Sequence, residues 1–203
     1  LAKRFKVTVR KAVEGIDPVR VSGAGHTFHQ RWAARRALQL VFPKDKLFAI
    51  VVEGLSPNEN LKLGQQAEEI ADLILFYGNG DTFETCTAQQ ILQFKYKGAA
   101  EPVTSSYLKK TIKKFAATLR EFRGSVTDDE IAKKLSFGFV TNAEFSADLW
   151  VAIASLKSGS TPETTGAKRQ LQYLKTWCQE EKIKAEDIFP LIEFRASTAD
   201  LPA

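Results

Sequence analysis

The chain has 203 residues, and its 44% hydrophobic and 26% charged content is that of a globular protein with one domain, or one domain and a small appendage. No apolar run approaches the roughly 18 residues of a membrane-spanning helix and no signal-peptide pattern opens the chain, which argues against a membrane protein and favours the cytoplasm. The formal net charge of +5 favours a polyanionic partner, and Cys86 and Cys178 lack the spacing of a disulfide framework, so we expect free thiols.

The first part of the chain predicts an arm, a helix and a strand. Residues 1–21 are basic and alternate in polarity, as in a half-exposed strand or a docking arm. A turn at 22–25 leads into a helix over 26–42, which ends before Pro43. The apolar face of this helix comprises Phe28, Trp32, Ala33, Ala37, Leu40 and Val41. The continuous apolar run 47–53 predicts a central strand buried on both faces.

The middle of the chain predicts a loop followed by two neighbouring strands. Residues 54–70 are polar and are interpreted as a loop, with a short helix around 62–70. The apolar segments 71–77 and 89–97 have strand length. A turn that begins at 78–81 starts the connection between them.

A helix over 105–123 has the clearest pattern, because its apolar residues repeat at intervals of four and three. Ser105 or Ser106 can cap its start, and Gly124 can end it. A strand at 133–141, helices at 143–157 and 165–181, and an apolar tail at 188–194 that docks complete the predicted elements. This order predicts an α/β fold with a sheet flanked by helices. It lacks the alternation, the GxGxxG motif and the Walker-type loop of nucleotide-binding folds.

Polar side chains occur within the two apolar segments 71–77 and 89–97 that predict neighbouring strands. Gln93 and Lys95 share one face of their strand, and Asp72 opens the strand before it. Buried amide and ammonium groups require partners. A carboxylate on one strand with Gln-x-Lys on the next is the layout of a metal-dependent phosphodiesterase site, with Asp72, Gln93 and the Phe94 carbonyl as Mg²⁺ ligands, Lys95 beside the attacking water, and Glu53 as an outer carboxylate.

Structural explanations compete with this interpretation. Asp72 can cap a turn, and Lys95 can extend its ammonium to solvent at a sheet edge. His26 and His29, three residues apart, have no evident third ligand for zinc. A serine or cysteine hydrolase is not favoured either, because no GxSxG motif occurs.

Two helices carry basic residues that can contact DNA phosphates. Arg31 and Arg35 lie one turn apart on the helix 26–42. Lys109, Lys113 and Arg120 form a row on the helix 105–123, with Lys110 and Lys114 beside it. A solvated polar face is the alternative explanation for both sets.

Several of these segments together resemble the PD-(D/E)xK nuclease superfamily. The segments are Phe28-His29-Gln30, Val52-Glu53-Gly54, Ala71-Asp72-Leu73-Ile74, Leu92-Gln93-Phe94-Lys95-Tyr96-Lys97 and Phe137-Gly138-Phe139-Val140-Thr141-Asn142. The likeness is closest to the double-stranded DNA endonuclease domains of bacterial anti-phage effectors, found in CD-NTase-associated (CBASS) effectors and STAND NTPase defence proteins. It covers roughly residues 22–155.

The resemblance implies a restriction-endonuclease-like mixed central sheet flanked by helices, and a Mg²⁺-dependent nuclease in which Mn²⁺ can substitute. It carries over Asp72, Gln93 and Lys95 as the catalytic core, with Asp72 and Gln93 on the metal. Glu53 and Gln30 are weaker candidates. Glu68 and Glu69 are rival acids, because the interval from Glu53 to Asp72 is long. Lys97 joins Arg31, Arg35, Lys109 and Lys113 as a candidate DNA contact.

The expected domain organisation is an N-terminal arm over 1–21, a nuclease core over 22–155 and a helical extension of the same domain over 156–203. Because methionine is absent and the first residue is Leu1, we expect an excised domain. The resemblance implies a C-terminal sensor domain, and nothing in these 203 residues suggests one. The expected partners are double-stranded DNA and further copies of the chain on activation. The alternative is a catalytically silent nuclease-like module that binds DNA or mediates assembly.

Overall fold

The computed structural model describes residues 7–9, 23–41, 46–52, 71–97 and 101–196. The predicted loop at 54–70 and most of the N-terminal arm lie outside these ranges, so those predictions are not addressed. None of the described helices has the length and hydropathy to span a bilayer.

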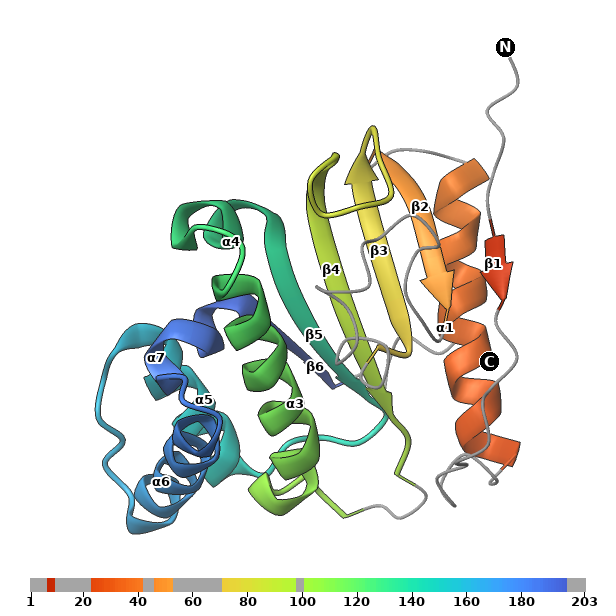
Figure 1. The fold of residues 1–203 in the computed structure, drawn as a ribbon. Coiled ribbons are helices and arrows are strands. Elements are labelled where there is room, and N and C mark those ends of the chain that lie inside the picture. The colour runs from red at the N-terminus through yellow and green to blue at the C-terminus, as the bar shows by residue number, and fades with distance from the viewer. Residues whose placement is uncertain (1–6, 10–22, 42–45, 53–70, 98–100, 197–203) are drawn as a thin grey trace.

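The described strands form one six-stranded sheet in which the order in space follows the order in the chain (Figure 1). The strands are β1 (Val7–Val9), β2 (Leu47–Val52), β3 (Leu73–Gly78), β4 (Cys86–Lys95), β5 (Leu135–Thr141) and β6 (Ile192–Ala196). β3 is antiparallel to both of its neighbours, whereas all other neighbouring pairs are parallel. The start of β3 therefore lies at the sheet edge where β2, β4, β5 and β6 end.

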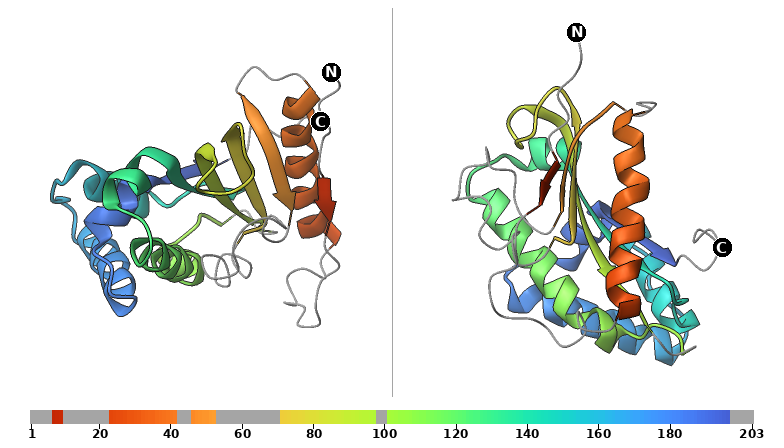
Figure 2. Two further views of the ribbon diagram at one scale, coloured as in Figure 1. Left: turned by 45° about the horizontal axis from the view of Figure 1, so that its top comes forward. Right: turned by 90° about the vertical axis from the view of Figure 1, so that its right-hand side faces the viewer.

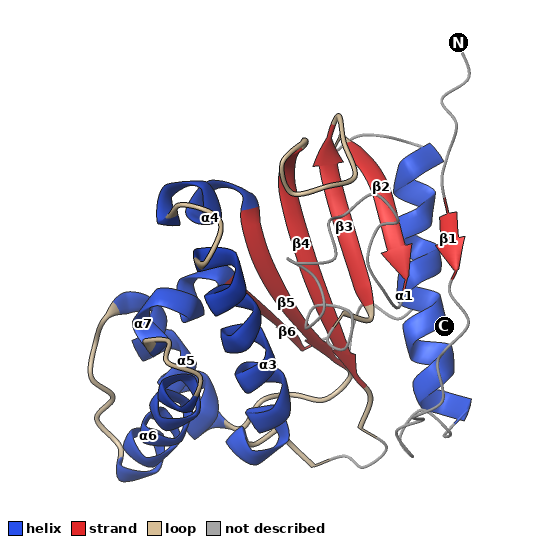
Figure 3. Ribbon diagram, viewed as in Figure 1, coloured by secondary structure: helices blue, strands red, loops and turns tan. Residues whose placement is uncertain are grey.

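Helices cover both faces of the sheet. The helix α1 (Gly23–Val41) lies on one face and α3 (Ser105–Arg123) on the other, as the right-hand view of Figure 2 shows. The remaining elements gather on the α3 side (Figure 3): α4 (Asp128–Lys134), α5 (Ala147–Ser158), α6 (Thr165–Glu180), α7 (Ala185–Ile188) and the 3₁₀ turn η2 (Phe189–Leu191). The chain thus has the expected α/β fold, a mixed sheet between helices, consistent with a restriction-endonuclease-like arrangement.

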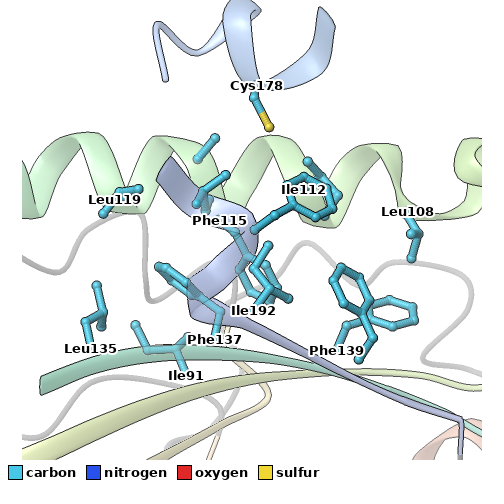
Figure 4. Close-up of a cluster of buried hydrophobic side chains, with 14 of the residues drawn as sticks. Ile91, Leu108, Ile112, Phe115, Leu119, Leu135, Phe137, Phe139, Cys178 and Ile192 are labelled. Atoms are coloured by element: carbon cyan, nitrogen blue, oxygen red, sulfur yellow. The ribbon is translucent and has the colours of Figure 1, made fainter. Parts of the chain in front are cut away.

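Each face of the sheet has its own hydrophobic core. The larger core lies under α3, where Phe115 stacks on Phe137 with ring centroids 4.7 Å apart, and Cys178 of α6 closes it from above (Figure 4). The smaller core joins α1 to the opposite face, where Trp32 stacks on Phe94 at 5.7 Å. Alternation along β4 therefore sends Leu92 and Phe94 to α1, and the intervening residues to the α3 side.

The strand predicted at 47–53 is less buried than expected. β2 covers Leu47–Val52, Glu53 lies outside the described residues, and the side chain of Phe48 is 44% exposed. Leu47 pairs with Tyr77 while Ala49 pairs with Phe76, so Phe48 is the extra residue of a β-bulge. A bulge reverses the alternation of faces, which explains why Phe48 alone among these apolar residues turns outward.

Four described elements were not predicted, namely α4, α7, η2 and β6. The segment interpreted as the start of a strand at Lys133 belongs to α4, and β5 begins only at Leu135. The Thr127 hydroxyl caps α4 by accepting from the Glu130 amide, and Glu130 accepts from Thr127 in return. The apolar tail contributes β6, a sixth strand beside β5, so the C-terminal segment is not purely helical.

Details at the ends of three helices also differ from the predictions. α1 already includes Gly23, where a turn was expected, and Val41 at its end is exposed rather than buried. The N-cap of α3 is Thr104 instead of Ser105 or Ser106, while Gly124 ends the helix as predicted. α5 begins at Ala147, later than expected, because the preceding residues pair with the connection that follows β4.

Candidate functional site

The direction of β3 brings the three predicted core residues to one edge of the sheet. Asp72 directly precedes β3, and Gln93 and Lys95 close β4. Leu73 pairs with Leu92 in the antiparallel register, so Asp72 faces Gln93, and the Asp72 amide donates to the Leu92 carbonyl at 3.0 Å. Residues that are 21 positions apart in the sequence become direct neighbours.

The Asp72 carboxylate is buried and held by two donors. Its exposed fraction is 4%, and that of Gln93 is 8%. The Gln93 Nε2 donates to Asp72 Oδ2, and the backbone amide of Phe94 donates to the same oxygen at 2.7 Å. Buried carboxylates are costly unless donors satisfy them, and these two donors fix the orientation of Asp72.

Lys95 ends β4 on the same face as Gln93. It is half-buried, and its register partner on β5 is Thr141. Since alternate strand residues share a face, the ammonium group projects from the same edge as the Gln93 amide. The geometry therefore assembles a carboxylate, an amide and an ammonium group on two adjacent strands.

His29 is a neighbour of the site that the sequence interpretation treated only as a discounted zinc ligand. Its Nδ1 lies 3.8 Å from Asp72 Oδ1, beyond hydrogen-bond distance but close enough for an ion pair when the imidazole is protonated. Its ring packs 5.6 Å from the ring of Phe94. The sequence signal that could have indicated His29 was its position between Phe28, on the predicted apolar face, and the candidate residue Gln30.

Of the remaining predicted catalytic residues, only Gln30 falls on a described residue, and it is not part of this group. Gln30 is exposed on α1, while its neighbour His29 approaches Asp72. Glu53, Glu68 and Glu69 lie outside the described residues, as does the side chain of His26.

The predicted basic row on α3 contacts residues of α6 and the residue after it, although Lys109 is exposed. Lys113 Nζ lies 3.1 Å from Glu180 and 3.4 Å from Glu181, and hydrogen bonds to these two carboxylates raise the pKa of Lys113. Lys109 Nζ lies 5.9 Å from the ring centroid of Trp177. Arg120 also pairs with Glu181. Lys113 and Arg120 are therefore paired with carboxylates within the protein, whereas Lys109 contacts an aromatic ring.

The other predicted DNA contacts differ in availability. The Lys97 ammonium donates to the carbonyls of Glu101 at 2.9 Å and Pro102 at 3.0 Å, so it serves the local fold. Arg31 and Arg35, in contrast, are exposed on α1, the helix that carries His29. Lys109 of α3 is exposed as well, whereas Lys113 is half-buried between its two carboxylate partners.

The donor set fits a hard divalent cation in part. Asp72 offers carboxylate oxygens and Gln93 an amide oxygen, which are ligand types that Mg²⁺ prefers. In the present arrangement Gln93 turns its nitrogen to Asp72, so a metal ion requires the amide to rotate. Among the described residues no three His, Cys, Asp or Glu side chains cluster as metal ligands.

Comparison with known proteins yields no further assignment. No protein-family model matches the chain, and no curated protein matches it. The functional argument therefore rests on the residues themselves.

Proposed function

We propose that the chain is a metal-dependent endonuclease that hydrolyses phosphodiester bonds of double-stranded DNA with little sequence specificity. The observation that carries the proposal is the pairing of Asp72 with Gln93 across β3 and β4, with Lys95 on the same face of β4. A buried carboxylate, an oxygen-bearing amide and a lysine at one sheet edge supply the groups that phosphodiester hydrolysis requires.

Each of the three residues has a distinct role in this proposal. Asp72, oriented by the Phe94 amide, and Gln93 hold Mg²⁺, or Mn²⁺ in its place. The bound cation supplies Lewis-acid neutralisation of the phosphoryl oxygens. Lys95 positions the attacking water and offsets the negative charge that develops on the phosphate. His29 limits the freedom of the Asp72 carboxylate from the side of α1.

The DNA duplex approaches along α1 in this proposal. Arg31 and Arg35 are exposed on the helix whose His29 approaches Asp72, so phosphates held by the arginines reach the sheet end from the α1 side, across from the face of β4 that carries Gln93 and Lys95. The net charge of +5 favours the same partner. Contacts of this kind are to the backbone, which accounts for low sequence specificity.

The cellular role follows the resemblance to anti-phage effector nucleases. Cutting both strands of a duplex requires two sites of opposite orientation, so we propose that the chain acts as a homo-oligomer when it is activated. Both cysteines are buried free thiols, in keeping with a reducing compartment such as the cytoplasm.

A silent DNA-binding module is the second candidate. The observation that favours it is that the Gln93 side-chain amide and the Phe94 backbone amide both donate to Asp72 Oδ2, which satisfies this oxygen without a cation. Such a module binds DNA in a salt-sensitive manner and yields no metal-dependent product.

Plasmid cleavage separates the two candidates. Wild type, Lys95→Ala and Lys133→Ala are compared at high protein concentration with Mg²⁺, with Mn²⁺ and with EDTA. Lys133 is an exposed lysine of α4, which precedes the opposite end of β5, and its replacement removes the same charge away from the site. The nuclease proposal expects metal-dependent nicking in wild type and Lys133→Ala, and its loss in Lys95→Ala. Wild-type cleavage by Lys95→Ala excludes the proposed site.

A further inference from the structure

The chain that leaves β4 directly after Lys95 is held by side chains rather than by the sheet. Asn142 Nδ2 donates to the Lys97 carbonyl at 2.8 Å, and the Lys97 amide donates to Asn142 Oδ1 at 2.7 Å. One side-chain amide thus pairs with both backbone groups of a single residue. Thr141, the residue before Asn142, is the register partner of Lys95, so Asn142 prolongs the pairing of β4 and β5 past the end of both strands.

A second side chain holds the residue between Lys95 and Lys97. The Tyr107 hydroxyl, on α3, donates to the Tyr96 carbonyl at 3.0 Å. Burial raises the pKa of Tyr107 above its ordinary value, which keeps the hydroxyl protonated as a donor. Three consecutive backbone groups after Lys95 are therefore fixed from two different elements.

The two connections that follow β4 and β5 remain paired further along. Val103 forms an isolated parallel bridge with Phe145, its amide donates to the Glu144 carbonyl at 2.7 Å, and its carbonyl accepts from the Ser146 amide at 3.0 Å. The Lys97 ammonium donates to two carbonyls of the same connection. Hydrogen bonds therefore hold Tyr96 and Lys97 after Lys95, and tie Lys97 to Glu101 and Pro102.

We infer that Asn142 and Tyr107 are positioning residues that fix the place of Lys95 in the site. This inference rests on the proposed nuclease function. A lysine at a strand end takes its position from its backbone, and two of the three fixed groups belong to the residue two places after it. Asparagine suits this task because its short side chain both donates and accepts. Aspartate lacks the donor for the Lys97 carbonyl.

The test compares steady-state DNA cleavage by wild type, Asn142→Ala, Tyr107→Phe, Lys95→Ala and Asn79→Ala. Asn79 is an exposed residue of the turn after β3, at the opposite end of the sheet, and serves as the matched control. A small misplacement of a reacting group can lower a rate by about 100-fold, so we expect kcat to fall about 10-fold or more in Asn142→Ala and less in Tyr107→Phe. The KM for DNA remains that of wild type in both, because neither residue binds the substrate.

Hydrogen exchange of the Lys97 amide, which loses its acceptor in Asn142→Ala, is measured on the same samples and is expected to accelerate. Tyr107→Phe loses a single hydroxyl and keeps the test decisive where Asn142→Ala does not fold. An unchanged kcat in both variants overturns the inference, as does a loss of activity that only matches the fraction of unfolded protein. Lys95→Ala tests the proposed nuclease site independently of this result. Absence of cleavage by the wild-type protein overturns the proposed function and, with it, this inference.

Discussion

The Gln93 side-chain amide donates to the Asp72 carboxylate across the β3–β4 pair. In the proposed nuclease, Gln93 stands at a position where the sequence resemblance implies a glutamate in many relatives. The amide satisfies Asp72 without a cation, whereas a second carboxylate in its place requires one. The choice between glutamine and glutamate at position 93 therefore decides whether the stability of the folded protein depends on a bound metal ion.

Gln93→Glu is therefore expected to make folding stability depend on metal. Two buried carboxylates repel each other, and Asp72 also loses a donor, so the metal-free variant loses about 1–3 kcal/mol of unfolding free energy. Mg²⁺ restores part of this loss by binding between the carboxylates. Thermal unfolding with Mg²⁺ and with EDTA measures the effect, with wild type and Gln90→Glu, a half-buried position earlier on β4, as controls. An equal response to Mg²⁺ in all three proteins contradicts the prediction.

The two neighbouring α1 residues His29 and Gln30 are expected to differ in importance. His29→Ala removes the imidazole 3.8 Å from Asp72, and we expect cleavage to slow about 10-fold while the melting temperature changes little. Gln30→Ala removes an exposed side chain and is expected to leave the rate near that of wild type. Initial cleavage rates of the two variants decide the matter. If Gln30→Ala lowers the cleavage rate more than His29→Ala does, the prediction is contradicted and Gln30, the candidate from the family resemblance, is favoured.

DNA binding is expected to depend on α1 and not on the basic row of α3. Replacing Arg31 and Arg35 together by alanine lowers affinity and reduces the slope of log affinity against log salt by about 2. Lys113→Ala leaves that slope unchanged, because Lys113 already pairs with Glu180 and Glu181. Fluorescence anisotropy with a labelled duplex at several salt concentrations provides the slopes. A reduced slope for Lys113→Ala alone shows that the duplex binds along α3.

The buried thiol of Cys178 predicts a loss of stability in alkaline solution. Burial raises the pKa of Cys178 to about 12, with the charge of Glu186 as a further cause, against an ordinary value of 9.0. Between these two values the unfolded chain releases the proton and the folded chain keeps it, so stability falls as pH rises above about 9. The slope approaches roughly 1.4 kcal/mol per pH unit. Urea unfolding of wild type and Cys178→Ala is measured from pH 8 to 10.5. We expect the difference in unfolding free energy between the two proteins to become smaller as the pH rises, and a difference that stays constant contradicts the prediction.

Gly138 on β5 is expected to be intolerant of any side chain. A Cβ atom there lies 2.3 Å from Leu92 Cδ2 on β4, inside the smaller core. Gly138→Ala therefore costs about 1–3 kcal/mol of unfolding free energy through overpacking. In a Leu92→Ala background the added methyl group enters the space that leucine vacated, so the same substitution costs less. Chemical denaturation of the four proteins in this double-mutant cycle measures the coupling, and additive losses contradict the steric explanation.

Periodicity predicts the longer elements of this fold with good accuracy. The boundaries of α3 agree with the predicted 105–123, because its apolar residues alternate at intervals of four and three over five turns. α4 has only seven residues, so its sole reliable signal was the capping pair Thr127 and Glu130. β6 has only five residues, and its pairing with β5 depends on a parallel crossover that local sequence does not encode.

The candidate site is predictable to the extent that it lies on adjacent strands. Asp72, Gln93 and Lys95 come together through one antiparallel pair, and a pattern of period two is enough to align them. His29 approaches Asp72 only because α1 crosses the sheet at a particular place, which depends on how Phe28 and Trp32 pack against Phe94. Likewise, Lys113 is paired because α6 packs beside α3, a contact between segments about 70 residues apart.

The agreement between strand order and chain order bears on how the protein is made. A chain that emerges from the ribosome from its N-terminus can pair each strand with the one before it, so the Asp72–Gln93 contact can form while α3 is still unsynthesised. The apolar side of β4 that α3 later covers, including Ile91, is then open to water and to other chains. Aggregation during synthesis is therefore expected to depend on the time between the synthesis of β4 and that of α3. The stability of the folded protein is expected to matter less.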